Sequence, residues 1–290
     1  MKELVIVSGK GGTGKTSLAA SFAALAKRPV MADCDVDASN LHLVLAPAIR
    51  QRNDFYSGHE AIIRPGDCID CGVCLTACRF DAVFEADKSI HGASYAVDPT
   101  ACEGCGVCIR LCPTKAIDFP ERLCGEWMVS ATRYGPMAHA RLGIAAENSG
   151  KLVTTVRQVA RLLAGQEERD LIITDGPPGI GCAAIASMTG ASLALAVTEP
   201  TVSGEHDLER ILTLAQHFSI PAAVCVNKWD LNPDMTARIE NQAQAAGARI
   251  VGRIRYDRAV TRAQVQECPV VETDAACGEE IRRIWTEIGL

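Results

Sequence analysis

The stretch "SGKGGTGKT", Ser8–Thr16, decides the fold. It matches the G-x4-G-K-[ST] pattern of a phosphate-binding loop, in which backbone amides surround phosphate oxygens. An apolar run with β-branched residues (3–8) precedes it, and an alanine-rich run of helical spacing (15–27) follows it. Because a strand, this loop and a helix occur in that order, the sequence predicts a nucleotide site.

The loop contains two lysines where phosphate binding needs only one. Lys15 is predicted to reach the β- and γ-phosphates, and the Thr16 hydroxyl to bind Mg²⁺. Lys10 either adds one more cation within the same chain or has another role, and the loop alone leaves both open. The predicted nucleotide-binding residues of the loop are Gly9, Lys10, Gly11, Gly12, Thr13, Gly14, Lys15, Thr16 and Ser17.

Four further apolar runs have the character of buried strands. They are "PVMADCD" (29–35), "DLIITD" (170–175), "SLALAVT" (192–198) and "IPAAVCVN" (220–227). Near-continuous apolar strands separated by helical segments are typical of a parallel sheet that is covered on both faces. We therefore predict a doubly wound, mostly parallel α/β fold.

Two of these strands end in acidic residues. Asp33 and Asp35 close the run at 29–35, and Asp175 opens "DGPPG" after a later strand. Of the first two acids, we expect one to contact the magnesium shell and the other to orient water. Asp175 matches a Walker B acid, and the glycine–proline run after it predicts a loop that responds to the γ-phosphate.

Several predicted helices have recognisable ends. Asn232 is the expected cap of a helix that starts at Pro233, and Gly247 follows its last turn. Ser203 is the expected cap of the helical segment after it. In the last segment (277–288), four apolar side chains share one face: Ile281, Ile284, Trp285 and Ile288.

The composition is that of a globular chain, with 48% hydrophobic and 22% charged residues. The formal net charge of -6 argues against a nucleic-acid partner, because phosphate neutralisation needs a basic face. No run reaches the roughly 18 apolar residues of a membrane span, and the N-terminus has no signal-peptide pattern. We expect a cytoplasmic protein without stable membrane insertion.

Cysteine is the unusual component, with 14 residues, of which eight lie between Cys68 and Cys112. They form two runs of C-x2-C-x2-C-x3-C, and in a cytoplasmic chain such runs indicate metal binding rather than disulfides. The spacing is that of a bacterial two-cluster ferredoxin, in which the fourth cysteine of each run ligates the other [4Fe-4S] cluster. The predicted ligand sets are Cys68, Cys71, Cys74 and Cys112 for one cluster, and Cys102, Cys105, Cys108 and Cys78 for the other.

Two zinc sites are the alternative, although zinc usually takes cysteine pairs with a longer spacer. Residues 62–120 interrupt the alternation of strands and helices. We predict an inserted ferredoxin domain there, and a discontinuous nucleotide-binding domain of residues 1–61 and 121–290.

Taken together, "KGGTGKT", "DCD…NL" and "DGPPG" resemble the motifs of the deviant-Walker-A ATPases, the MinD/ParA/Mrp group that includes the nitrogenase iron protein. With its cysteine runs, the chain resembles MinD-like ATPases that carry an inserted two-cluster ferredoxin domain, and the resemblance covers essentially the whole chain. It implies a slow ATPase that binds ATP or ADP with Mg²⁺ and depends on a dimer, with itself or with a paralogue.

The resemblance also implies residue roles. Lys10 becomes the signature lysine, which crosses the dimer interface to the nucleotide of the other subunit. Asp35 becomes the water-positioning acid of switch I, and Asp175 the acid of switch II. With Lys15 these are the predicted catalytic residues, and Thr16, Asp35 and Asp175 are the expected contacts of Mg²⁺.

The stretch "NKWD", Asn227–Asp230, bears on which nucleotide base the site binds. The resemblance makes Asn227 a contact of adenine, yet the same letters match the N-K-x-D pattern with which GTPases bind guanine through Asp230. We favour ATP over GTP, with Asn227, Lys228 and Asp230 as the predicted base-contacting residues. A cap or turn before "LNPD" is the alternative for Asp230.

The remaining cysteines are scattered. Cys182 lies seven residues after Asp175, where the resemblance to the nitrogenase iron protein implies a ligand of a cluster shared between subunits. Cys124 is a conceivable second ligand, and the alternative for Cys182 is a small buried apolar side chain. Of the others, Cys34, Cys225 and Cys268 are expected in the core and Cys277 at the cap of the last helix.

Two segments remain. The polar segment 132–153 contains Arg133, His139 and Lys151, which we consider candidates to face the nucleotide or the partner subunit. MinD ends in a membrane-seeking helix, but "EEIRRIWTEIGL" has three glutamates and two arginines, which favours packing on the domain.

Two functions are compatible with these features. In the first, ATP turnover gates electron transfer from two [4Fe-4S] clusters to a redox partner, or metallocluster or cofactor assembly on one. In the second, the chain is a MinD/ParA-like spatial organiser or regulator, with structural or redox-sensing clusters. The predicted ferredoxin domain favours the first, because an organiser has no need of low-potential centres.

Overall fold

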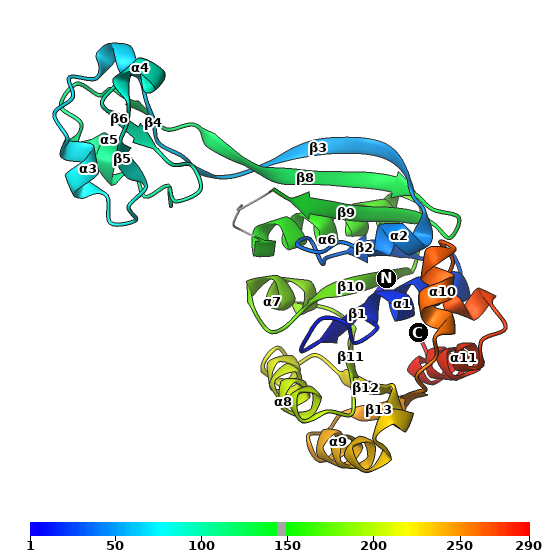
Figure 1. Cartoon of the computed structure of the whole chain (residues 1–290). Coiled ribbons are helices and arrows are strands. Elements are labelled where there is room, and N and C mark those ends of the chain that lie inside the picture. Colours follow the sequence, from blue (N-terminus) through cyan, green and yellow to red (C-terminus); the bar gives the residue numbers. More distant parts are fainter. Residues whose placement is uncertain (144–148) are drawn as a thin grey trace. The chain divides into compact units, whose positions relative to one another are not determined.

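The computed structural model describes residues 1–143 and 149–290. The chain divides into two compact units. The larger consists of Met1–Asn53, Glu126–Leu142 and Ser149–Leu290, and the smaller is built around Asp54–Gly125. The chain passes between them along strands β3 (Ala48–His59) and β8 (Glu121–Ala131) (Figure 1). The predicted insert, residues 62–120, falls within the smaller unit.

A nine-stranded sheet forms the centre of the larger unit, in the order β13-β12-β11-β1-β10-β2-β9-β8-β3. Each neighbouring pair of strands from β13 to β9 is parallel, which confirms the predicted mostly parallel sheet. The remaining strands of the sheet are β1 (Lys2–Ser8), β2 (Val30–Asp33), β9 (Pro136–Leu142), β10 (Leu171–Pro178), β11 (Leu193–Thr198), β12 (Ala222–Asn227) and β13 (Arg249–Ile254).

Helices cover both faces of this sheet because alternate side chains of its central strands point to opposite sides. Leu4 and Ile6 pack with α1, α2, α10 and α11, whereas Val5 and Val7 pack with α7, α8 and α9. The bounds are α1 (Lys15–Leu25), α2 (Leu41–Leu45), α6 (Ser149–Gln166), α7 (Cys182–Met188), α8 (Val202–His217), α9 (Pro233–Ala245), α10 (Ala259–Val265) and α11 (Ala276–Ile288).

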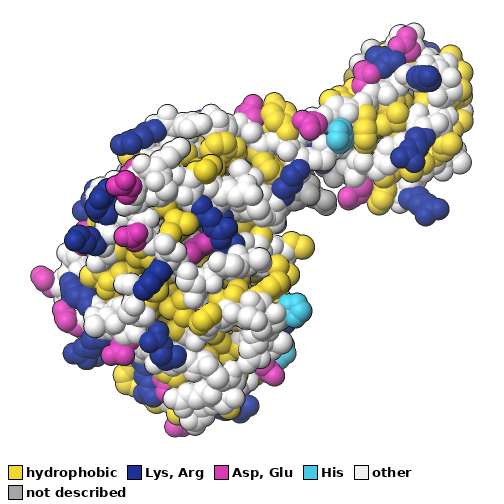
Figure 2. Space-filling model, turned by 180° about the vertical axis from the view of Figure 1, so that it is seen from behind, with side chains coloured by type: hydrophobic (Ala, Val, Ile, Leu, Met, Phe, Trp, Pro, Cys, Tyr) yellow, Lys and Arg dark blue, Asp and Glu magenta, His cyan; other side chains and the backbone are white. Residues whose placement is uncertain are grey.

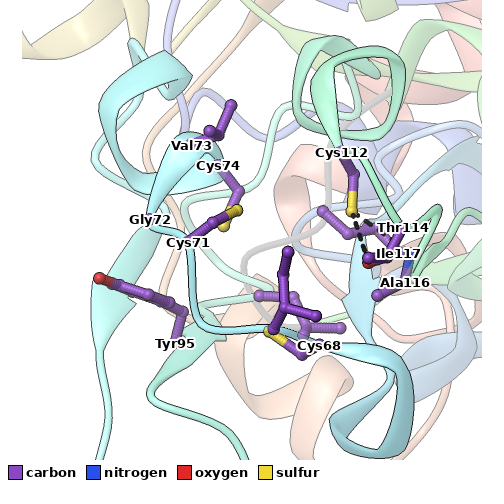
Figure 3. Close-up of a pocket in the computed structure, with 12 residues that line it drawn as sticks. Cys68, Cys71, Gly72, Val73, Cys74, Tyr95, Cys112, Thr114, Ala116 and Ile117 are labelled. Atoms are coloured by element: carbon purple, nitrogen blue, oxygen red, sulfur yellow. Dashed lines mark hydrogen bonds between the residues drawn. The ribbon is translucent and has the colours of Figure 1, made fainter.

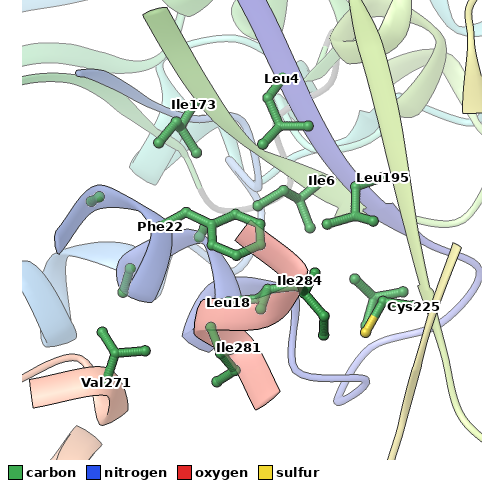
Figure 4. Packing of buried hydrophobic residues seen from close by; sticks show 14 of the residues in the cluster. Leu4, Ile6, Leu18, Phe22, Ile173, Leu195, Cys225, Val271, Ile281 and Ile284 are labelled. Carbon is green, nitrogen blue, oxygen red and sulfur yellow. The ribbon is translucent and has the colours of Figure 1, made fainter. Parts of the chain in front are cut away.

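The first core cluster shows why the last helix belongs to the fold. Phe22 of α1 packs against Trp285 with ring centroids 4.9 Å apart. Ile281 and Ile284 of α11 are buried in the same cluster as Phe22 (Figure 4). The predicted packing of the last segment is therefore confirmed. Among the described residues, no helix combines the length and apolar composition needed to cross a bilayer.

The observed helix caps match the caps predicted from the sequence in one case and differ from them in two. The Asn232 side chain accepts from the Met235 amide at 3.1 Å, as predicted. The cap of α8 is Thr201, which accepts from the Gly204 amide, so the prediction of Ser203 was wrong by two residues. Cys277 is buried within α11 and does not cap it, because the helix begins one residue earlier.

Four strands of the sheet were not predicted: β3, β8, β9 and β13. In β3 most side chains are exposed, so the segment lacks an apolar run. The polar segment 132–153 contains β9, whose residues pair with β2. Charged side chains are spread over the sheet and its helices, and Figure 2 shows Lys, Arg, Asp and Glu interspersed on one face.

The smaller unit has little regular structure and an internal repeat. Its strands form two short antiparallel pairs, β4 with β7 and β5 with β6. Helices α3 and α5 each start after a glycine with positive φ, Gly72 and Gly106, at matching places in the two cysteine runs. The bounds are β4 (Ile62–Ile63), α3 (Val73–Ala77), β5 (Val83–Glu85), α4 (Lys88–His91), β6 (Tyr95–Val97), α5 (Val107–Leu111) and β7 (Ile117–Asp118).

A buried ion pair ties the first strand to α6. Arg157 Nε lies 2.7 Å from Glu3 Oε1, and both side chains are almost fully buried. The same guanidinium donates to the carbonyls of Ala186 and Thr189 at the end of α7. Arg161 contacts the other carboxylate oxygen of Glu3 from a more exposed position.

We predict that Arg157→Met lowers the free energy of unfolding by about 3 kcal/mol, because the Glu3 carboxylate then stays buried with only the more exposed Arg161 as an ion-pair partner among the described residues. Arg161→Met is the matched control on the same helix and acid, with an expected loss below about 1 kcal/mol. Urea unfolding under anaerobic, reducing conditions measures both. Equal losses would contradict the assignment of Arg157 as the principal partner.

Candidate nucleotide and metal sites

The phosphate loop joins β1 to α1, and its glycines are required by close neighbours. A Cβ at Gly9 would lie 2.0 Å from the Cβ of Asp207, so α8 approaches the loop too closely for any side chain. Gly14 has φ +96°, and a Cβ there would lie 2.5 Å from Asn227 Nδ2. The loop is thus held by α8 on one side and by the end of β12 on the other.

Lys15 is the central cation of this site. Its ammonium is buried and donates to Ser8 Oγ at 2.8 Å. Burial lowers the pKa of Lys15, while the nearby carboxyl groups of Asp175, Asp35 and Asp33 oppose that shift. A phosphate oxygen would replace the hydroxyl as a stronger, charge-assisted acceptor.

The three acids differ in what they contact. Asp33 accepts from the Asp35 amide, the Ser39 hydroxyl and the Leu41 amide, so it holds the segment after β2 in place. Asp35 accepts from the Ala38 amide at 3.3 Å and lines the nucleotide cavity described below. Of the two acids that the sequence left open, Asp35 is therefore the one available to ligands.

Asp175 is fully buried, and within the described part of the chain neither carboxylate oxygen has a hydrogen-bond partner of good geometry. Burial raises its pKa to about 7, although the neighbouring Thr16 hydroxyl and Lys15 ammonium favour the charged form. An orphaned buried carboxylate beside a threonine hydroxyl supplies two of the oxygen donors that Mg²⁺ prefers, with waters and phosphate oxygens left to complete its shell. The chain's residues thus fit a magnesium ion next to the loop.

Lys10 is held within its own chain. Its ammonium lies 3.3 Å from Glu199 Oε2 and 3.4 Å from the hydroxyls of both Thr201 and Ser203. Glu199 also forms an ion pair with Lys228, whose ammonium donates to the Gly12 carbonyl at 3.3 Å. The Glu199 carboxylate therefore pairs with both Lys10 of the loop and Lys228. The sequence did not reveal these ion pairs.

The side chains that were predicted to contact the base form hydrogen bonds with other groups of the protein. Asn227 Nδ2 donates to the Thr13 carbonyl at 2.8 Å, which anchors the loop. Asp230 Oδ1 accepts from the Tyr256 amide at 2.7 Å, and this supports the structural alternative for that acid. The guanine-reading role of Asp230 is weakened, because the bond fixes one of its two oxygens.

These elements surround a cavity of about 790 Å³, large enough for a nucleotide. Besides the loop, Asp35, Asn227 and Lys228, residues after β13 line it, and the sequence missed them because it did not predict that strand. An apolar run before "RYD" was the available signal. The missed lining residues are Arg255, Tyr256, Asp257, Val260, Thr261, Gln264, Val265 and Glu267.

The eight cysteines of the smaller unit surround two pockets. One is lined by Cys68, Cys71, Cys74 and Cys112 (Figure 3). The other is lined by Cys78, Cys102, Cys105 and Cys108. Each pocket therefore combines three cysteines of one run with the fourth of the other run, in the sets that the spacing predicts. Among the described residues, no group of three or more His, Cys, Asp or Glu side chains is arranged to hold a single metal ion.

Burial and backbone amides act in opposite directions on the thiols that line the two pockets. Burial raises the pKa of the Cys74 and Cys108 thiols. For Cys78 and Cys112 burial acts in the same direction, but backbone amides outweigh it and lower the pKa. The Ala116 amide donates to Cys112 Sγ at 3.3 Å. Apolar walls and amide donors to sulfur fit iron–sulfur clusters, whose thiolate ligands accept such bonds.

The scattered cysteines divide into buried and exposed residues. Cys34 and Cys225 are fully buried, as predicted, and Cys268 packs partly buried against the core. Cys124 is buried and donates to the Ser57 carbonyl. Cys182 is exposed at the start of α7, so the interpretation as a buried apolar residue was wrong.

The structure places the three candidate residues of the segment 132–153 outside the lining of the nucleotide cavity. Arg133 pairs with Glu272, and neither Arg133 nor His139 lines the nucleotide cavity. His139 is buried in β9, where Nε2 lies 2.8 Å from Ser130 Oγ. Lys151 belongs to α6. Residues 144–148 of this segment lie outside the described part of the chain.

The fold and the loop define a P-loop NTPase: a phosphate loop after β1, with acids at the ends of β2 and β10. The chain belongs to the family of the CobQ/CobB/MinD/ParA nucleotide binding domain, whose profile matches residues 4–270.

Relatives and solved structures agree with this assignment. An uncharacterised protein of Methanocaldococcus jannaschii is 32% identical over 233 residues, 79% of each chain. The septum site-determining protein MinD of Pyrococcus horikoshii, complexed with Mg-ADP, superposes with a TM-score of 0.59 at 15% identity, over 99% of this chain and 96% of that one. McdA of Cyanothece in complex with ATP gives 0.58 at 18% identity, over 100% and 97%. At these identities the structures show a common fold.

His139 provides a test of this part of the structure. Burial, and then the charges of His42, Arg141 and Arg52, lower its pKa to about 4. The folded protein therefore binds this proton less readily than the unfolded chain, and stability is lost as the pH falls from the unfolded value near 6.5 through 4.

We predict that, between pH 7 and pH 4, the free energy of unfolding of the wild type falls by up to about 3 kcal/mol more than that of His139→Gln. Urea unfolding at a series of pH values measures the difference between the two proteins. A difference independent of pH would mean that His139 is not held neutral.

Proposed function

We propose that the chain is a dimeric, ATP-hydrolysing switch that carries two [4Fe-4S] clusters. It couples its nucleotide state to electron transfer to a partner protein, or to metallocluster or cofactor assembly on one. The observation that carries the proposal is the coexistence of a family nucleotide loop and two pockets, each lined by four cysteines from both runs. The Mg-ADP and ATP complexes of structures with the same fold support adenine over guanine.

At the nucleotide, the loop amides and Lys15 bind the phosphates, and Lys15 exchanges the Ser8 hydroxyl for phosphate oxygens. Thr16, Asp175 and Asp35 would hold Mg²⁺, which would neutralise charge on the phosphates. Asp35 orients a water whose oxygen bonds to the γ-phosphorus as the bond to the ADP oxygen breaks. The products are ADP and inorganic phosphate.

Lys10 gives the reaction its dependence on a second subunit. In the isolated chain its ammonium is bound by Glu199, Thr201 and Ser203. To neutralise phosphate charge in the partner's site, Lys10 must leave these groups, so Glu199 opposes the step and the phosphates of the other subunit favour it. Glu199 thus makes dimer formation depend on bound triphosphate.

The cysteines of the smaller unit would hold the clusters in the sets found around the two pockets. A [4Fe-4S] cluster supplies one-electron transfer at low potential. The chain's own residues hold the thiolates, donate backbone amides to sulfur and enclose the pockets with apolar side chains such as Ile117 and Phe119. Eight permanent ligands suit electron carriage better than cluster donation, because a donated cluster needs labile ligands.

We predict that protein purified without oxygen contains about eight irons per chain and has low-potential [4Fe-4S] signals in electron paramagnetic resonance. Cys112→Ser and Cys78→Ser should each remove the signal of one cluster. Cys268→Ser, outside both pockets, is the matched control and should keep the full iron content. Stoichiometric zinc in place of iron would refute the cluster proposal and leave the organiser or regulator function.

We further predict that Lys10→Ala lowers the dimer-dependent ATPase rate by roughly 10³-fold, the range of a trans-acting cation, with little change in nucleotide affinity. Glu199→Gln should instead dimerise at lower ATP concentration, because Lys10 is released. Glu205→Gln on α8, which pairs with Arg238, is the control. Phosphate release and light scattering are the measurements, and unchanged turnover in Lys10→Ala would remove its trans role.

A further inference from the structure

A second cavity, of about 700 Å³, lies in the larger unit beside the nucleotide cavity. The two cavities share Ala38, Asn40, Leu43 and Glu267 in their walls, so the segment after Asp35 and Glu267 separate them. Strands β3, β8 and β9 and helix α2 supply the other walls. None of the predicted nucleotide or cluster residues lines it, and the proposed function does not use it.

Polar groups of β9 enter this second cavity with unused hydrogen-bonding capacity. His139 and Arg141 are two residues apart on the strand, and therefore face the same side. Ser130 contacts His139 Nε2, whereas Nδ1 has no partner among the described residues. Arg141 makes no hydrogen bond or ion pair within the part of the chain that the structure describes. His42 of α2 adds a second imidazole to the wall.

The charges around the second cavity limit its ligand. Arg52 is paired with Glu126 at 2.9 Å, so that guanidinium is already neutralised. The exposed carboxyl groups of Asp37 and Glu267 also line the wall. Arg141 has no ion-pair partner among the described residues. Beside the two exposed carboxyl groups of Asp37 and Glu267, one guanidinium favours an anion of single charge over a phosphate group, whose additional charge these acids would repel.

Apolar side chains form the remainder of the wall. Leu43, Ile49 and Met128 line the second cavity, and Leu43 and Ile49 are otherwise exposed to solvent. A ligand that covered them would remove apolar surface from water, at about 25 cal/mol per Å². The wall therefore suits a molecule with an apolar part as well as an anionic group.

We propose that the second cavity binds a small organic carboxylate with an aliphatic body. Its carboxylate is held by the Arg141 guanidinium and by Nδ1–H of His139, and its body packs on Leu43, Ile49 and Met128. A planar guanidinium binds a carboxylate through two parallel hydrogen bonds, which fixes the orientation. When the Ser130 hydroxyl donates to Nε2, the proton of the neutral imidazole is on Nδ1, where it can be donated.

This site is independent of ATP hydrolysis and of the clusters. Binding in the nucleotide-free protein is therefore its test, and failure of the ATPase or cluster experiments would leave it standing.

Hexanoate is a suitable probe, with hexanol as the uncharged control of the same length. In ligand-detected NMR with the full, nucleotide-free chain, hexanoate should bind and hexanol should bind at least about tenfold more weakly. Arg141→Met should weaken hexanoate about tenfold, and Arg141→Lys should restore part of the affinity. Arg283→Met on α11, outside the cavity, is the matched control and should bind as the wild type does.

Equal binding of hexanoate and hexanol would overturn the proposal, as would unchanged affinity in Arg141→Met. Tighter binding of inorganic phosphate than of hexanoate would also overturn it, because the site would then select charge rather than a carboxylate with an apolar body. A thermal melt of each variant confirms folding, and partial recovery in Arg141→Lys excludes a purely structural effect of Arg141→Met.

Discussion

The mutual dependence of one buried ammonium and three carboxyl groups underlies the rest of this structure. Burial lowers the pKa of Lys15, and burial is the largest cause that raises the pKa of Asp33 to about 8 and that of Asp175 to about 7. The three carboxyl groups favour the charged form of Lys15, and the Lys15 ammonium favours the charged form of Asp175. The parallel sheet places these groups together. Strand β10 pairs with both β1 and β2, with Asp175 opposite Ile6 and Asp33, so the ends of the three strands meet at one edge.

That arrangement suits the proposed binding of a triphosphate with its metal. Asp33 is fully engaged with the segment after β2, whereas Asp175 has no hydrogen-bond partner among the described residues. A magnesium ion would satisfy Asp175, and phosphate oxygens would satisfy Lys15. Glu199 forms ion pairs with both Lys10 and Lys228. In the proposed function, nucleotide binding and release of Lys10 are therefore separate events that depend on separate residues.

Much of the architecture was predictable from sequence because buried parallel strands have a simple signature. Five apolar runs were recognised, and all five are strands of the sheet. Strand β3 was missed because its side chains are largely exposed, and β13 because Gly252 interrupts it where Ile284 packs closely. The residues that line the nucleotide cavity after β13 were missed with it. The two cysteine sets, in contrast, followed from spacing alone and lie around the two pockets.

The sequence by itself determined the elements whose chemistry is local: the phosphate loop, the buried strands, the caps such as Asn232, and the duplicated cysteine runs. Only the tertiary structure decided which distant groups meet. It joined Lys10 to Glu199, Asn227 to the loop carbonyl of Thr13, and Asp230 to the Tyr256 amide. The physical reason is that a hydrogen-bonding side chain takes whichever partner the packing of strands and helices brings within about 3 Å, and sequence spacing carries no record of that partner.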